Sequence, residues 1–162
     1  MRTAAQAATP RPMSCGRCRR SRRWDWARTI VEAGVSPLAG GGDHSITYSI
    51  LKAVGAKRPV GMVNIDAHCD TSGPYEGSKF HHGGPFRQAV LDGVLDPERV
   101  IQIGIRGGAE YLWEFSYESG MTVIHADEVD RMGLDAVIAK ALAVIGDGLT
   151  YVREQCGAGG ER

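Results

Sequence analysis

The chain has 162 residues, enough for one domain with a buried core, and its 43% hydrophobic and 23% charged content is ordinary for a soluble globular protein. The formal net charge is zero, but the first 23 residues hold seven arginines and no acidic residue. The remaining 12 basic and 19 acidic residues leave the rest of the chain at about −7. This acidic body argues against nucleic-acid binding. The sequence contains neither a secretory signal nor an apolar run long enough to cross a bilayer, so we expect a cytoplasmic protein.

Residues 1–23 are rich in Arg, Ala and Pro and have no apolar period, so we expect a disordered basic tail there. An organelle transit peptide is the alternative interpretation of this segment. Cys15 and Cys18 form a lone C-x-x-C in the tail, without the second pair that a zinc site needs.

From Trp24 onward, short apolar runs alternate with apolar residues at helical spacing. Helices are predicted at 24–33, 45–54, 86–91 and 134–145, and strands at 35–39, 60–65, 100–105, 121–125 and from 149. This alternation predicts an α/β fold with three αβα layers around a parallel sheet. After Val152 the sequence turns polar and glycine-rich, so we expect residues 153–162 to form a tail and the sheet to be incomplete at the C-terminus.

The motif Asp66-Ala67-His68-Cys69-Asp70 follows the predicted strand 60–65. Its acidic and imidazole side chains stand at alternate positions, so they can converge if the backbone stays extended. Two carboxylates and one imidazole suit Mn²⁺, Zn²⁺ or Fe²⁺, and ligands bind at the carboxyl ends of strands in open α/β sheets. The alternative is that Asp66 caps a helix and His68 is a surface loop residue.

Two further motifs place histidines after predicted strands. In G-G-D-H-S at residues 41–45, Asp43 or Ser45 can cap a helix while His44 faces a metal. In H-H-G-G-P-F at residues 81–86, His81 and His82 end a long loop over 69–84, and long ordered loops are usually functional. A glycine-rich turn with a packed histidine and a surface histidine pair are the alternative interpretations.

In this order, the three motifs resemble those of the arginase/agmatinase (ureohydrolase) family, over about residues 24–152. Residues 79–93 and 105–107 are most similar to guanidinobutyrase and guanidinopropionase members. The resemblance implies an arginase-like fold and hydrolysis of agmatine, guanidinobutyrate or guanidinopropionate to urea and an amine, with two Mn²⁺ ions per subunit. It implies a small guanidino substrate, no nucleic-acid or membrane partner, and a homotrimer or homohexamer.

The resemblance also implies which residues hold the metals. His44 and Asp70 bind one manganese ion, His68 binds the other, and Asp66 bridges both. Two such ions lower the pKa of a water molecule that attacks the guanidinium carbon. Family members supply two more carboxylate ligands from a D-x-D motif after the strand at 150–152, where this chain reads Arg-Glu-Gln-Cys.

Two other roles follow from the resemblance. His82 is expected to carry a proton to the leaving amine, and Asp43 to orient His44 without ligating a metal. Because four of the six family ligands remain, we expect a partial ureohydrolase domain over 24–152 that binds manganese poorly and has little or no activity. An inactive fragment or pseudoenzyme, a formiminoglutamase-like hydrolase and a zinc deacetylase of the same fold are the alternatives.

Overall fold

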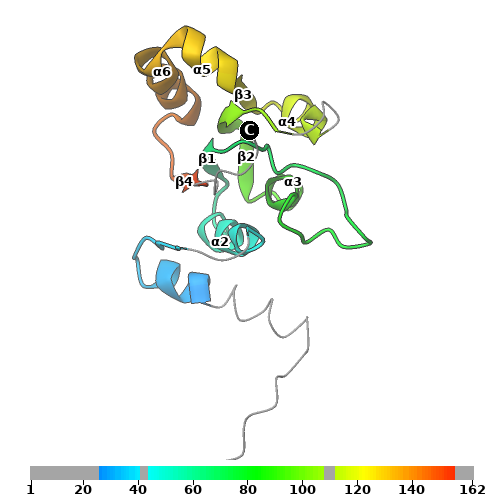
Figure 1. Ribbon diagram of the computed structural model, residues 1–162. Helices are drawn as coiled ribbons and strands as arrows, with labels where there is room; N and C mark the ends of the chain where they lie inside the picture. The colour runs from blue at the N-terminus through cyan, green and yellow to red at the C-terminus, as the bar shows by residue number, and fades with distance from the viewer. Residues whose placement is uncertain (1–25, 41–43, 108–111, 156–162) are drawn as a thin grey trace, which may run out of the picture.

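The computed structural model describes residues 26–40, 44–107 and 112–155. Its centre is a four-stranded sheet in the order β3-β2-β1-β4, drawn in Figure 1. The strands are β1 Val60–Ile65, β2 Leu95–Ile105, β3 Thr122–His125 and β4 Thr150–Glu154. All three neighbouring pairs are parallel. The predicted parallel sheet is therefore confirmed. Asp43, the basic tail and residues 156–162 lie outside the described residues.

Helices cover both faces of the sheet (Figure 1). On one side lie α2 Ile46–Val54, α3 Pro85–Leu91 and α4 Glu114–Glu118, and on the other α5 Ala126–Met132 and α6 Leu134–Ile145. Residues 26–32 form a further helix next to α2. This arrangement confirms the three-layer αβα fold. None of the helices in the described part of the chain is long and apolar enough to span a membrane.

The apolar run of β1 explains its central position, because it supplies side chains to both layers. Val60 and Met62 pack with Leu51 of α2 and Phe86 of α3. The next residue, Val63, packs in the cluster on the α6 side. A strand between two helical layers needs apolar residues on both faces, and each large side chain buried there contributes about 1.5–3 kcal/mol.

Two predicted elements differ from the structure. Residues 35–39 form no strand, because no described strand pairs with them. Leu38 in this segment is consequently 93% exposed. The last strand does not stop at Val152, since Arg153 and Glu154 continue the pairing with β1 opposite Asn64 and Ile65. β4 lies at the edge of the described sheet, where polar side chains are tolerated.

The loops that carry the sequence motifs meet at the carboxyl ends of β1 and β2. The predicted loop over 69–84 contains no helix and closes on itself where Ser72 N and Oγ both donate to Gly83 O, at 2.9 and 2.6 Å. The backbone N–H groups of Arg106 and Gly107 donate to Ala67 O at 2.9 and 2.8 Å. These hydrogen bonds fix the motif after β1 against the end of β2.

Candidate metal-binding site

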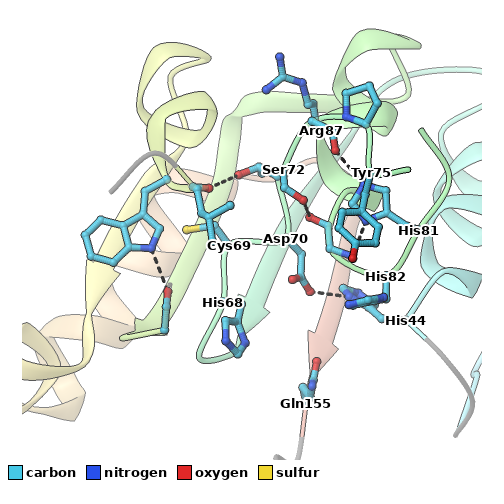
Figure 2. A pocket seen from close by; sticks show the side chains of 17 residues that line it. His44, His68, Cys69, Asp70, Ser72, Tyr75, His81, His82, Arg87 and Gln155 are labelled. Atoms are coloured by element: carbon cyan, nitrogen blue, oxygen red, sulfur yellow. Dashed lines mark hydrogen bonds and ion pairs between the residues drawn. The ribbon is translucent and has the colours of Figure 1, made fainter. Parts of the chain in front are cut away.

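A pocket of about 880 Å³ opens at this edge of the sheet (Figure 2). Its volume lies within the range of small-molecule sites, and the three sequence motifs contribute most of its polar lining. Helix α3 and the segment before α4 complete the wall. The lining includes His44, His68, Asp70, His82, Arg87 and Trp113.

His44 and Asp70 form a close pair in this pocket, joined by a dashed line in Figure 2. Nδ1 of His44 lies 2.5 Å from Oδ2 of Asp70, and the two side chains are only 10% and 13% exposed. The imidazole thus faces a carboxylate oxygen, and neither buried ring nitrogen of His44 has a well-aligned hydrogen-bond partner among the described residues. Buried polar atoms without partners are costly. An unpartnered imidazole beside a carboxylate suits a divalent cation.

The backbone of Asp70 is held in an unusual conformation. Its φ of +50° lies in the left-handed region, which costs free energy for a residue other than glycine. Phe86 N donates to Asp70 O at 3.3 Å, and the Phe86 ring packs edge-on to His44 with centroids 5.3 Å apart. The start of α3 therefore braces both members of the pair.

Asp66 lies behind the pocket at the end of β1, with its side chain only 2% exposed. Oδ1 accepts the backbone N–H of His68 at 3.1 Å and lies 3.8 Å from His68 Nδ1. Oδ2 accepts a hydrogen bond from Nη1 of Arg153 on β4. The His68 ring is 55% exposed and reaches the pocket mouth.

The absence of a side chain at Gly107 leaves space for the His68 ring just beyond the end of β2. A Cβ at position 107 would come within 2.4 Å of His68 Nε2, closer than real atoms approach. Asn64 Nδ2 also donates to His68 O at 3.4 Å. A glycine is therefore required at position 107 for this ring position.

The two loop histidines differ in their surroundings. His81 accepts the backbone N–H of Gly83 at Nδ1, at 3.3 Å, so Nε2 carries the proton and donates to Gly73 O at 2.9 Å. Both its nitrogens thus hold the loop together. His82 is exposed and lines the pocket, so its imidazole is accessible to a bound molecule.

Cys69 takes no part as a nucleophile. It is 2% exposed, and burial raises the pKa of its thiol to about 11, so the thiol is neutral at pH 7. Its carbonyl accepts a hydrogen bond from Gln102 Nε2 at 2.7 Å. This buried hydrogen bond anchors the middle of the D-x-H-x-D motif to β2.

The amino-acid sequence of residues 21–152 matches the arginase family. This chain belongs to the arginase family. A guanidinopropionase from Pseudomonas aeruginosa is 46% identical over 77% of this chain and 40% of its own length. The chain therefore spans less than half of that relative.

Solved structures of the family have the same fold. The proclavaminate amidino hydrolase from Streptomyces clavuligerus superposes with a TM-score of 0.79 at 28% identity, over 87% of this chain and 48% of that one. A formiminoglutamase from Trypanosoma cruzi, crystallised with Mn²⁺, superposes with a TM-score of 0.72 at 21% identity, over 82% and 46%. The first supports the family assignment, and the second shows the arginase fold alone.

Compared with the expected two-metal centre of this family, the four predicted ligands are separated into two pairs. His44 lies with Asp70, and Asp66 with His68. The part of the chain that the structure describes holds no cluster of three or more His, Cys, Asp or Glu residues placed for a metal. The first pair fits one cation, whereas the second is engaged by Arg153 and does not fit a second ion as it stands.

Sequence reasoning missed Arg153, which it assigned to a tail outside the sheet. No local signal could have placed Arg153 opposite Asn64, because that position depends on the register of β4 against β1. It also gave no role to Trp113, which lines the pocket and donates from Nε1 to Gly107 O at 3.1 Å. Nothing in the local sequence distinguishes that tryptophan from a core residue.

Proposed function

We propose that this chain carries one half of the active site of a manganese-dependent ureohydrolase, which hydrolyses a guanidino compound to urea and an amine. The observation that supports it most is the His44–Asp70 pair, a buried imidazole without hydrogen bonds beside a carboxylate in an open pocket. The similarity to a guanidinopropionase supports the reaction class. Imidazole and carboxylate ligands together suit Mn²⁺.

The four predicted ligands and His82 have proposed parts in the reaction. His44 and Asp70 would hold the cation, which when bound would lower the pKa of the attacking water toward neutrality. Asp66 and His68 belong to the second half of the ligand set. The exposed imidazole of His82 lines the pocket, where it donates a proton to the leaving nitrogen as a general acid.

Arg87 supports a substrate that ends in a carboxylate. It lines the pocket, with its guanidinium carbon 4.4 Å from the centre of the Phe115 ring, and Figure 2 places it at the opposite end of the pocket from His68. A guanidinium stacked on an aromatic ring keeps its donors free to bind a carboxylate in two-point fashion. The proposed substrates are therefore 3-guanidinopropionate or 4-guanidinobutyrate in preference to agmatine, whose far end is an amine.

The 162-residue polypeptide by itself is expected to turn over slowly or not at all, because Arg153 occupies one of the two ligand pairs that the structure describes and leaves the His44–Asp70 pair for a cation. Competence of the half-site is therefore tested in a chimera, with residues 1–152 joined to the C-terminal part of the Pseudomonas aeruginosa guanidinopropionase. Urea release is measured with and without Mn²⁺ for the three guanidino compounds.

The chimera is expected to release urea only with Mn²⁺, and Asp70→Asn to abolish the release. His82→Ala is expected to lower kcat roughly 10²–10⁴-fold, the usual contribution of general acid catalysis. Arg87→Met is expected to raise KM for the guanidino acids and not for agmatine. A folded chimera that releases no urea, or whose Asp70→Asn variant keeps full activity, contradicts the proposal. Formamide from formiminoglutamate without urea from any guanidino compound would favour the formiminoglutamase-like alternative.

A further inference from the structure

Arg153 places a positive charge on the most deeply buried carboxylate of the site. The Asp66 side chain is 2% exposed and that of Arg153 is 9% exposed, and Arg153 Nη1 donates to Asp66 Oδ2. The other oxygen, Oδ1, accepts the backbone N–H of His68 at 3.1 Å. Donors from this chain therefore engage both oxygens of Asp66.

Strand pairing sets the position of Arg153. β4 runs parallel to β1 with Arg153 directly opposite Asn64, so the backbone ladder carries this side chain to the end of β1. Nη1 also donates to Asn64 Oδ1 at 3.0 Å, and Nη2 donates to Gln155 Oε1. The planar guanidinium is thus held by three side-chain oxygens, which suits its rigid fork of donors.

A guanidinium and a divalent cation cannot both lie against Asp66 Oδ2. The two positive charges would repel strongly in a site with little water, and displacing Arg153 would leave its buried charge without a counter-ion. The oxygens of Asn64, Asp66 and Gln155 hold the guanidinium in place, so a metal ion at Asp66 would have to break these contacts. The carboxylate is therefore already neutralised before any metal arrives.

We infer that Arg153 is an internal cation that occupies Asp66 in place of a metal ion. The Asp66–His68 pair is consequently closed to metal, while the His44–Asp70 pair stays open. This inference rests on the metal-binding role proposed above for these residues. It predicts binding of one cation where the family fold is built for two.

Coordination of a diamagnetic ion shifts the ¹⁵N resonance of the imidazole nitrogen that binds it, so a Cd²⁺ titration of the ¹⁵N-histidine-labelled full chain reports which pair binds. In the unchanged chain, Cd²⁺ is expected to shift the His44 resonance and to leave the His68 resonance in place. In Arg153→Gln, which removes the charge and keeps an amide donor, both signals are expected to shift. Total Mn²⁺ affinity, measured by electron paramagnetic resonance, is expected to rise roughly tenfold in that variant, or about 1.4 kcal/mol.

Two matched variants separate the effect of Arg153 from general effects. Arg153→Lys keeps the charge and is expected to leave the His68 resonance in place when Cd²⁺ is added. Arg131→Gln removes a positive charge from an exposed pair on α5 and is also expected to leave His68 unchanged. Circular dichroism verifies that each variant is folded. If Arg153→Gln does not fold, the inference is judged on the His68 resonance of the unchanged chain and of Arg153→Lys.

A Cd²⁺-induced shift of His68 together with His44 in the unchanged chain would overturn the inference, since Asp66 would then be open to metal. A folded Arg153→Gln variant in which the His68 resonance does not shift would also overturn it. Loss of the His44 effect in every variant would instead contradict the proposed His44–Asp70 cation site. Failure of the inference therefore appears at the His68 resonance, and failure of the proposed cation site appears at the His44 resonance.

Discussion

Nδ1 of His44 lies 2.5 Å from Oδ2 of Asp70, although the two residues come from different segments, one just before α2 and one from the loop after β1. Both side chains are nearly buried, and the imidazole has no hydrogen-bond partner among the described residues. The pair therefore exists before any ligand binds. Such preorganisation lowers the cost of binding a cation, because a small separation of two side chains already in contact makes room for the ion.

Removing the charge of this pair is expected to weaken cation binding. Asp70→Asn keeps the shape of the side chain and removes the negative charge that faces His44, so Mn²⁺ affinity is expected to fall at least tenfold, or about 1.4 kcal/mol. Isothermal titration calorimetry measures this affinity. Asp127→Asn, in an exposed ion pair on α5, serves as the matched control and is expected to bind Mn²⁺ as the unchanged chain does. Equal affinities for the two variants would contradict the assignment.

The junction after α2 is expected to tolerate no side chain at Gly55. A Cβ there would lie 2.2 Å from Val94 O and 2.9 Å from Leu51 O, both backbone atoms that cannot move alone. Gly55→Ala is expected to lower the free energy of unfolding by about 1–3 kcal/mol, the usual cost of overpacking. Gly40→Ala, where a Cβ meets nothing within 4 Å, is the control. Urea denaturation that gave the same loss for both would refute the packing argument.

Asp92 is expected to make stability depend on acid pH. It accepts hydrogen bonds from Tyr48 and Lys52, which join the end of α3 to α2. Burial acts to raise the pKa of Asp92, but these hydrogen bonds outweigh it, and the pKa lies below its ordinary value. A carboxyl with a depressed folded-state pKa stabilises the fold above its unfolded-state pKa, and the contribution is lost as pH falls through the folded-state pKa.

Asp92→Asn is therefore expected to lose about 0.2–1 kcal/mol at pH 7, the usual worth of a partly exposed pair, and to match the unchanged chain at the lowest pH. Chemical denaturation at a series of pH values from 7 to 2 measures the difference. Glu118→Gln, at an exposed position of α4, is the charge-matched control. A loss in Asp92→Asn that does not shrink on acidification would show that the ionised form is not what stabilises the contact.

The edge strand β4 is expected to promote association between copies of the polypeptide. β4 ends the strand order of the described sheet, and Val152 on it is 67% exposed. A charged lysine on an edge strand disfavours pairing with another strand, so Val152→Lys is expected to reduce the concentration-dependent mass seen by sedimentation velocity. Leu38→Lys, also highly exposed but outside the sheet, is expected to leave association unchanged. Reduced association in Leu38→Lys with unchanged association in Val152→Lys would place the interface outside β4.

The sequence was sufficient to predict the layers of the fold and the edge of the sheet that carries the pocket. Apolar runs such as Val60–Ile65 have the composition of a strand buried on both faces, and motif residues directly after them must lie at the carboxyl ends. His44, His68 and Asp70 accordingly line one pocket. The backbone does not stay extended through the D-x-H-x-D motif, because Asp70 adopts a positive φ and its side chain turns toward His44.

Contacts between distant segments were beyond local sequence reasoning. The Arg153–Asp66 pair joins residues 87 positions apart and depends on the register of β4 against β1. A polar Arg-Glu pair after an apolar run normally marks the end of a strand, and only an edge position allows the strand to continue through it. The roles of His82 and of the metal ligands stay predictions that the experiments above address.

The most direct test of this account is a crystal structure of the full chain grown with Mn²⁺, with data collected at the manganese absorption edge. One anomalous peak is predicted within bonding distance of both the His44 imidazole and the carboxylate of Asp70, with Arg153 still bound to Asp66. The account would be contradicted by crystals with no peak at His44, or by a manganese ion on Asp66 with the Arg153 side chain displaced.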